Sequence, residues 1–174
     1  MKSKDGAVVE PLEQAVGRLL AEKKLTIACA ESCTGGLLTS RLTDVAGSSA
    51  YVMGAVVSYT NEVKASLVGV QEATLRAFGA VSAETAREMA AGIQRAIPAD
   101  LGVGITGIAG PGGATAEKPV GLVYIAVSYA GHILVRRNLF TGTRTEVKRQ
   151  SVEKALAMVQ EMFVKMGRMS TSKF

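Results

Sequence analysis

The segment from Thr26 to Gly36 constrains the fold more than any other part of this 174-residue chain. A short apolar run, expected as the central strand over residues 25–30, ends in the small and polar sequence Glu-Ser-Cys-Thr-Gly-Gly. Leucines then recur at helical spacing, which predicts a helix to about Val45. A buried strand, a tight turn and a helix start present side chains at the carboxyl edge of a sheet, where open α/β folds bind ligands. The segment therefore predicts both an architecture and a candidate site.

Strand and helix patterns alternate along most of the chain, and a hairpin pattern follows near Gly131. This order predicts an α/β fold, a three-layer α/β/α sandwich on a mixed, mainly parallel sheet of about five strands with one antiparallel strand. Thr60 and Ser82 are predicted helix N-caps. The predicted strands are 25–30, 51–59 (buried), 100–105, 120–129 and 132–140, and the main predicted helices are 11–23, 71–78, 82–97 and 142–166.

The chain is 48% hydrophobic, and one domain over residues 9–166 with flexible tails at 1–8 and 167–174 is expected. The net charge of +5 comes from residues of both signs spread along the sequence. Because no basic run or basic-aromatic stripe is present, nucleic-acid binding is disfavoured, and a phosphorylated small molecule explains the basic excess equally well. No secretory signal or membrane span is found, which predicts a cytoplasmic protein without a membrane partner.

The chain contains a single histidine, His132. A serine or cysteine nucleophile would therefore have little prospect of a histidine as its general base. Cys29 and Cys33 are expected as reduced thiols rather than a disulfide. A His-based zinc site and a Ser-His-Asp triad are therefore both disfavoured, and no metal or other cofactor is expected.

Three predicted loops meet at one edge of the sheet if their strands are parallel. They bring together Ser32, Tyr59 and Lys64, and a glycine-rich loop from Thr106 to Gly113. A lysine of lowered pKa can take the proton of a serine hydroxyl, and a tyrosine can orient the lysine or carry a proton. Glycine-turn N–H groups can stabilise an oxyanion. This combination indicates acyl transfer that ends in amide or ester hydrolysis.

Each of these residues also has an ordinary structural interpretation. Ser32 is compatible with a helix cap, Cys33 is a rival nucleophile or a packing residue, and Lys64 fits an exposed helix position. Tyr59 fits a strand-end packing position with a hydrated hydroxyl. The glycine-rich loop lacks the Gly-Lys-Ser/Thr ending of a P-loop and leads into a strand, so nucleoside triphosphate binding is disfavoured.

Four ordered motifs resemble the C-terminal domain of the CinA family, from about Val9 to Val164. They are Ala30 to Leu37, Ser58 to Lys64, Val103 to Gly113 and Lys118 to Gly121. The family includes nicotinamide-nucleotide amidase, and the chain resembles the stand-alone form that lacks the N-terminal pyrophosphatase-like domain. Thr60, Ala114 to Ala116 and Thr141 to Thr143 depart from the family pattern.

The resemblance implies a metal-free amidohydrolase that converts nicotinamide mononucleotide and water to nicotinate mononucleotide and ammonia. It maps the catalytic residues onto Ser32, Tyr59 and Lys64. A non-catalytic nucleotide-sensing or partner-binding module linked to competence or DNA damage is the alternative, and a homo-oligomer is compatible with either function. The expected substrate-binding residues are Glu31, Cys33, Thr34, Gly35, Gly36, Ser49, Thr106, Gly107, Gly110 and Arg144.

Overall fold

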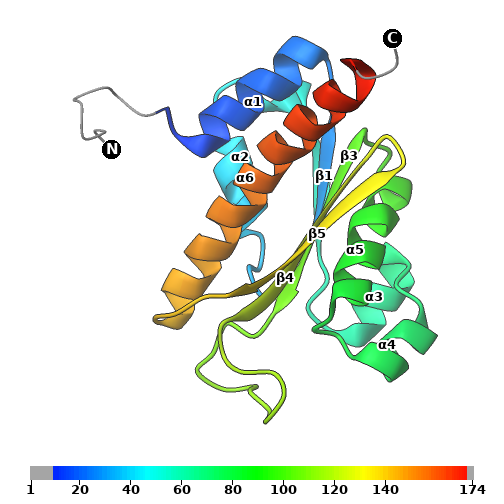
Figure 1. The fold of residues 1–174 in the computed structure, drawn as a ribbon, viewed down its shortest axis with the longest axis vertical. Helices are drawn as coiled ribbons and strands as arrows, with labels where there is room; N and C mark the ends of the chain where they lie inside the picture. Colours follow the sequence, from blue (N-terminus) through cyan, green and yellow to red (C-terminus); the bar gives the residue numbers. More distant parts are fainter. Residues whose placement is uncertain (1–9, 172–174) are drawn as a thin grey trace.

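A five-stranded sheet forms the middle layer of the computed structural model, which describes residues 10–171 (Figure 1). Helices cover both of its faces, which confirms the predicted α/β/α sandwich. The strands are β1 (Ile27–Glu31), β2 (Val52–Val57), β3 (Leu101–Gly107), β4 (Leu122–Tyr129) and β5 (His132–Leu139). The helices are α1 (Leu12–Lys23), α2 (Leu37–Thr43), α3 (Asn61–Val68), α4 (Glu72–Phe78), α5 (Ala83–Ala96) and α6 (Arg144–Thr171), with a short 3₁₀ helix at Ser48–Ala50.

The strands are arranged in the order β2-β1-β3-β4-β5. β1 pairs in parallel with both β2 and β3, while β4 is antiparallel to β3 and to β5. Four strands therefore point in one direction and only β4 opposes them, as the sequence predicted. The central strand is β3 rather than β1, because the hairpin of β4 and β5 adds to the sheet beyond β3.

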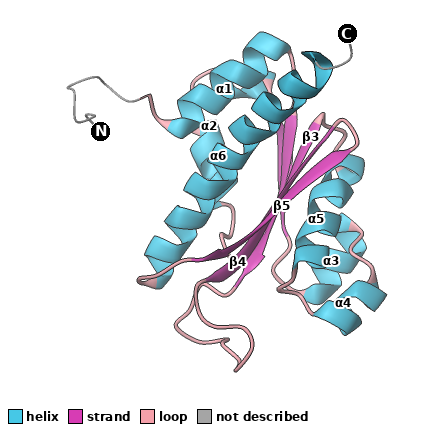
Figure 2. Cartoon of the chain, in the orientation of Figure 1, coloured by secondary structure: helices cyan, strands magenta, loops and turns pink. Residues whose placement is uncertain are grey.

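Two helical layers enclose this sheet: α1, α2 and α6 cover one face, and α3, α4 and α5 cover the other (Figure 2). β3 shows how one strand serves both faces. Val103 and Ile105 belong to the core below α6, whereas Gly102 and Gly104 alternate with them on the α5 side. A Cβ atom added to Gly104 would lie 2.5 Å from the Ala86 carbonyl oxygen, so only glycine lets α5 approach so closely.

Two helix caps and one hairpin turn lie where local sequence signals predicted them. Thr60 and Ser82 accept N-cap hydrogen bonds from Val63 and Thr85, as predicted. Ala130 and Gly131 have positive φ angles in the β4–β5 turn, which confirms the predicted hairpin.

Two expectations about the elements were wrong. β2 is an edge strand, and the side chains of Met53 and Val57 are 51% and 48% exposed, although a buried strand was predicted. An apolar run shows that a strand is favoured but does not reveal its place in the sheet. α6 continues to Thr171, beyond the predicted end at residue 166 and into the tail predicted at 167–174. The predicted tail at 1–8 and residues 172–174 lie outside the described residues.

The parallel arrangement of β1, β2 and β3 places their carboxyl ends at one edge of the sheet. Ser32 follows β1, the segment from Ser58 to Lys64 follows β2, and the glycine-rich loop follows β3. The three predicted site segments therefore converge, as the rule for ligand sites in open α/β sheets requires.

No helix within residues 10–171 is long and apolar enough to cross a membrane.

Candidate active site

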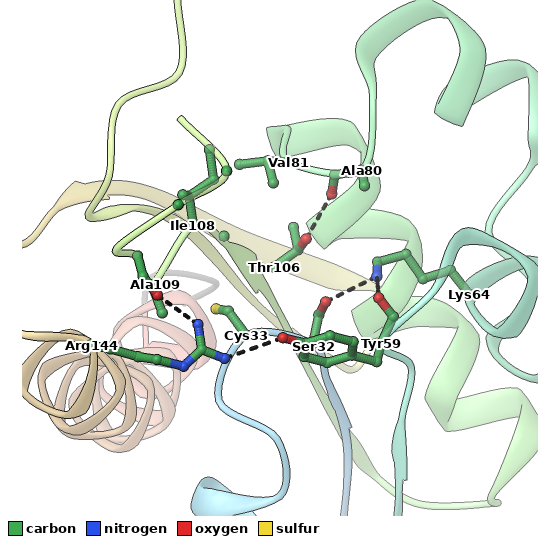
Figure 3. A pocket seen from close by; sticks show the side chains of 14 residues that line it. Ser32, Cys33, Tyr59, Lys64, Ala80, Val81, Thr106, Ile108, Ala109 and Arg144 are labelled. Atoms are coloured by element: carbon green, nitrogen blue, oxygen red, sulfur yellow. Dashed lines mark hydrogen bonds between the residues drawn. The ribbon is translucent and has the colours of Figure 1, made fainter. Parts of the chain in front are cut away.

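A cavity of about 270 Å³ opens at this edge of the sheet (Figure 3). Its floor carries Ser32 and Lys64, and its mouth is bordered by Tyr59 and Arg144. The remaining lining consists of Cys33, Ala80, Val81, Thr106, Gly107, Ile108, Ala109, Gly110, Gly112 and Gly113.

Lys64 and Ser32 form the chemical centre of the cavity. Lys64 Nζ lies 3.0 Å from Ser32 Oγ and donates a 2.7 Å hydrogen bond to the Ser58 carbonyl oxygen. A second, longer contact of 3.5 Å joins Lys64 Nζ to the Tyr59 carbonyl oxygen. The Thr60 cap sets the start of α3, and Lys64 lies one turn later, so its side chain reaches back under the end of β2. The predicted meeting of serine and lysine is present in the structure.

Burial governs the charge of Lys64, whose residue is only 1% exposed. Removal from water disfavours the ammonium form and lowers the pKa of Lys64 below its ordinary value. No carboxylate among the described residues forms a salt bridge with Lys64. A neutral amine can donate to the Ser58 carbonyl and still offer its lone pair to the Ser32 hydroxyl. The surroundings thus favour a lysine that acts as a base.

Glu31 holds the turn that carries Ser32. Its carboxylate is fully buried and accepts hydrogen bonds from the N–H groups of Gly36, Leu38 and Thr39 at 2.9–3.1 Å, and from the Thr39 hydroxyl at 2.7 Å. These bonds satisfy the free N–H groups at the start of α2. Glu31 therefore caps α2. Although a substrate-binding role was expected for Glu31, it does not line the cavity.

Ser32 is consequently free of the capping role that the sequence also allowed. Its N–H group donates to the Ile105 carbonyl oxygen, which ties the turn to β3, while its side chain faces Lys64 (Figure 3).

Cys33 lines the cavity next to Ser32 but is poorly suited to nucleophilic attack. Burial raises the pKa of its thiol to about 11, so the thiol remains protonated near neutral pH. Burial also raises the pKa of the Cys29 thiol within β1. Both cysteines are free, as predicted.

Tyr59 and Arg144 join the two sides of the cavity mouth. Arg144 donates from Nη2 to the Tyr59 hydroxyl at 3.2 Å and from Nη1 to the Gly110 carbonyl oxygen at 2.8 Å. Tyr59 is 59% exposed, and it accepts the long hydrogen bond from Lys64 through its backbone carbonyl rather than through its hydroxyl. A phenol that accepts a hydrogen bond from arginine keeps its own proton available for donation.

The structure places the other predicted substrate contacts in two groups. Thr106, Gly107, Gly110, Arg144 and Cys33 line the cavity. The remaining residues, Thr34, Gly35, Gly36 and Ser49, do not line it: Thr34 is buried and Ser49 is exposed in the 3₁₀ helix.

The sequence analysis missed the wall formed by Ala80 and Val81, between α4 and α5. Ile108 and Ala109 lie within the predicted glycine-rich loop but were not singled out. The only sequence signal for the Ala80–Val81 segment is the helix break at Gly79, just before the Ser82 cap. No group of three or more histidine, cysteine or acidic residues that could hold a metal ion is found in the described part of the chain.

The fold and the site define an α/β domain with a buried serine–lysine pair in a cavity at the carboxyl edge of its sheet. Over residues 9–163 the chain matches the CinA C-terminal domain, and it belongs to that family. It is 51% identical over 150 residues to a putative competence-damage inducible protein of Moorella thermoacetica, covering 86% of this chain and 36% of the relative. A CinA-like protein of Chlorobium limicola is also 51% identical over 150 residues, covering 83% of this chain and 35% of that protein.

Solved structures of the same superfamily share the fold along almost their whole length. The competence/damage inducible protein CihA of Agrobacterium tumefaciens aligns with a TM-score of 0.82 and 40% identity, covering 89% of this chain and 98% of that one. A CinA superfamily protein of Klebsiella pneumoniae aligns with a TM-score of 0.86 and 34% identity, covering 88% and 96%. By contrast, the chain spans little more than a third of the length of the curated relatives.

The lowered pKa of Lys64 has a consequence for stability. Because the unfolded chain binds the lysine proton up to about pH 10 while the folded chain disfavours it, the stability of the wild type rises with pH between the two pKa values. We expect the free energy of unfolding of Lys64→Met, relative to wild type, to fall as the pH is raised from about 7 to about 10. Each unit of pKa lowering corresponds to about 1.4 kcal/mol of this change.

Urea unfolding at several pH values measures this difference. Lys165→Met, at an exposed position in α6, is the matched control and should show no such trend. A difference between Lys64→Met and wild type that is independent of pH would show that folding leaves the pKa of Lys64 unchanged.

Proposed function

We propose that this domain is an amidohydrolase that converts nicotinamide mononucleotide and water to nicotinate mononucleotide and ammonia, with Ser32 as nucleophile. The observation that carries the proposal is the 3.0 Å separation of Lys64 Nζ and Ser32 Oγ inside a cavity where burial lowers the pKa of the lysine. The chain belongs to the CinA family, and the resemblance of its motifs to that family implies nicotinamide mononucleotide as substrate.

In the acylation step, neutral Lys64 takes the Ser32 proton while the serine oxygen bonds to the carboxamide carbon. The Ser58 carbonyl holds the amine by its N–H group and so directs the lone pair toward Ser32. The carboxamide oxygen becomes an oxyanion, and the candidate donors are the Cys33 N–H group beside Ser32 and the N–H groups of Ala109 and Gly110 in the glycine-rich loop. One such donor typically lowers the barrier by about 3 kcal/mol.

Collapse of this intermediate breaks the carbon–nitrogen bond and releases ammonia. The proton that Lys64 received passes to the departing nitrogen, and the Tyr59 hydroxyl at the cavity mouth assists that transfer. Water then adds to the acyl-enzyme, and Lys64 takes a proton from the water. Breakage of the serine ester releases the acid and returns the proton to Ser32, which completes the cycle.

Single and double substitutions test this assignment. We expect Ser32→Ala and Lys64→Ala to fold but to lose almost all ammonia release from nicotinamide mononucleotide, because either change removes the activated nucleophile. The double variant should be little worse than either single one, since the two residues act as a unit. A coupled ammonia assay measures the rates, and Cys33→Ala is the neighbouring control, which should retain substantial activity.

Near-normal turnover by folded Ser32→Ala would contradict covalent catalysis at this serine. Loss of all turnover in folded Cys33→Ala would transfer the nucleophile role to the thiol. A wild type that binds the mononucleotide without releasing ammonia would instead favour the non-catalytic nucleotide-sensing module.

The substrate phosphate has basic partners beside the cavity. Arg144 lies at the mouth, and Lys148 Nζ would lie 3.6 Å from a Cβ atom added to Gly35, beside the turn that carries Ser32. We propose that Arg144 exchanges its contacts with Tyr59 and Gly110 for the phosphate of the bound mononucleotide.

We expect Arg144→Met to raise KM about 10- to 150-fold, which corresponds to about 1.5–3 kcal/mol for a charged hydrogen bond. Nicotinamide riboside, which lacks the phosphate, should be a much poorer substrate for the wild type, and Arg144→Met should discriminate less between the two compounds. Steady-state kinetics measure both effects, with the exposed Arg149→Met as control on the same helix. Equal turnover of riboside and mononucleotide would rule out this phosphate site.

A further inference from the structure

Lys118 connects two walls of the cavity that are far apart in the sequence. It lies in the connection between β3 and β4, residues 108–121, which includes the glycine-rich loop. Its Nζ donates a 2.7 Å hydrogen bond to the Phe78 carbonyl oxygen at the end of α4. A Cβ atom added to the adjacent Gly79 would lie 3.1 Å from the same Nζ. The amine therefore lies against the α4–α5 connection, at the surface of the domain.

The backbone that carries Lys118 is itself fixed by a local turn. The Lys118 N–H group donates to the Thr115 hydroxyl at 3.1 Å, and the Thr115 N–H group donates to the Lys118 carbonyl oxygen at 2.9 Å. This pair of bonds holds the backbone at Lys118, from which the side-chain amine reaches the Phe78 carbonyl oxygen.

Three successive carbonyl groups of the α4–α5 connection accept side-chain hydrogen bonds from three different elements. The Phe78 carbonyl accepts from Lys118, the Gly79 carbonyl accepts from Thr85 at 2.8 Å, and the Ala80 carbonyl accepts from Thr106 at 2.7 Å. Carbonyl groups at the end of a helix lack partners within the helix and suit a cation. These hydrogen bonds hold the backbone of residues 78–80, the segment that leads into the lining residues Ala80 and Val81.

The Lys118 bond differs from the other two in what it joins. Thr85 and Thr106 belong to regular elements of the domain, α5 and β3, so their bonds position the α4–α5 connection on the sheet. Lys118 belongs to the loop that supplies Ile108 and Ala109 to the cavity. The Thr106 bond already joins the two walls where β3 ends, because Thr106 itself lines the cavity, and the Lys118 bond adds a second tie farther along the loop. Each of these walls presents apolar side chains.

We propose that Lys118 is a positioning residue that, together with Thr106, holds the separation between the Ala80–Val81 wall and the Ile108–Ala109 wall. This inference rests on the proposed function for its substrate, the planar pyridine ring of a nicotinamide, which fits an apolar slot between two fixed walls. Ser32 and Lys64 lie on other elements, so loss of the Lys118 bond weakens binding of the ring and leaves the bond-making step largely intact.

Two substitutions with a matched control test this role. Lys118→Met keeps the apolar stem and removes the donor, whereas Lys118→Arg keeps a cationic donor. The control, Lys165→Met, alters an exposed lysine in α6, outside the cavity lining. Hydrogen exchange followed by mass spectrometry measures how often the backbone amides of the loop open to solvent, and it needs no substrate. We expect faster exchange of peptides covering residues 78–82 and 108–121 in Lys118→Met, a return toward wild-type exchange in Lys118→Arg, and no change in Lys165→Met.

Kinetics supply the second readout. Lys118→Met should raise KM for nicotinamide mononucleotide about tenfold, because about 1.4 kcal/mol of the binding free energy then goes into ordering the two walls, with kcat within about twofold of wild type. Lys118→Arg should restore most of the lost affinity. Wild-type exchange in Lys118→Met, or a fall in kcat without a change in KM, would overturn the proposal. If the wild type does not hydrolyse the mononucleotide, the proposed function fails, while the exchange comparison still decides the role of Lys118.

Discussion

The contact between a buried lysine amine and a serine hydroxyl is the interaction on which the proposed chemistry depends. Lys64 is almost completely buried, with its amine 2.7 Å from the Ser58 carbonyl oxygen and 3.0 Å from Ser32 Oγ. In water a lysine is protonated and cannot act as a base at neutral pH. The fold withdraws the amine from water, and within residues 10–171 no carboxylate forms a salt bridge that would stabilise its charge, so the pKa of Lys64 is lowered. Burial of a polar group, which ordinarily only destabilises a protein, here favours the neutral amine that the proposed base requires.

Much of the surrounding structure serves to hold these two side chains together. The Thr60 cap sets the register of α3 and hence the position of Lys64. Glu31 binds the N–H groups at the start of α2, which closes the turn after β1 and leaves Ser32 free to face the lysine. A fully buried carboxylate is costly unless its oxygens are satisfied, and four hydrogen bonds meet that requirement. Glu31 thus positions Ser32, the proposed nucleophile, through the backbone.

The sequence predicted what depends on local pattern. Strand and helix existence, the caps at Thr60 and Ser82, and the meeting of Ser32 with Lys64 all follow from periodicity, capping chemistry and the geometry of parallel strands. It failed where strand order and distant contacts decide the outcome. The exposed face of β2 arises from its place at the edge of the sheet, which its apolar residues did not reveal. The role of Glu31 depends on which way one carboxylate turns, and the Ala80–Val81 wall depends on how α4 and α5 dock.

The pH dependence of kcat/KM for nicotinamide mononucleotide tests the central claim most directly, because it reports the ionisation of the free enzyme's essential base. If neutral Lys64 activates Ser32, kcat/KM rises with pH along a single limb and reaches a plateau. The midpoint of that limb lies below the ordinary lysine pKa of about 10.4. A value of kcat/KM that does not change between about pH 6 and pH 10, or that falls as the pH rises, would contradict a lysine base at this site.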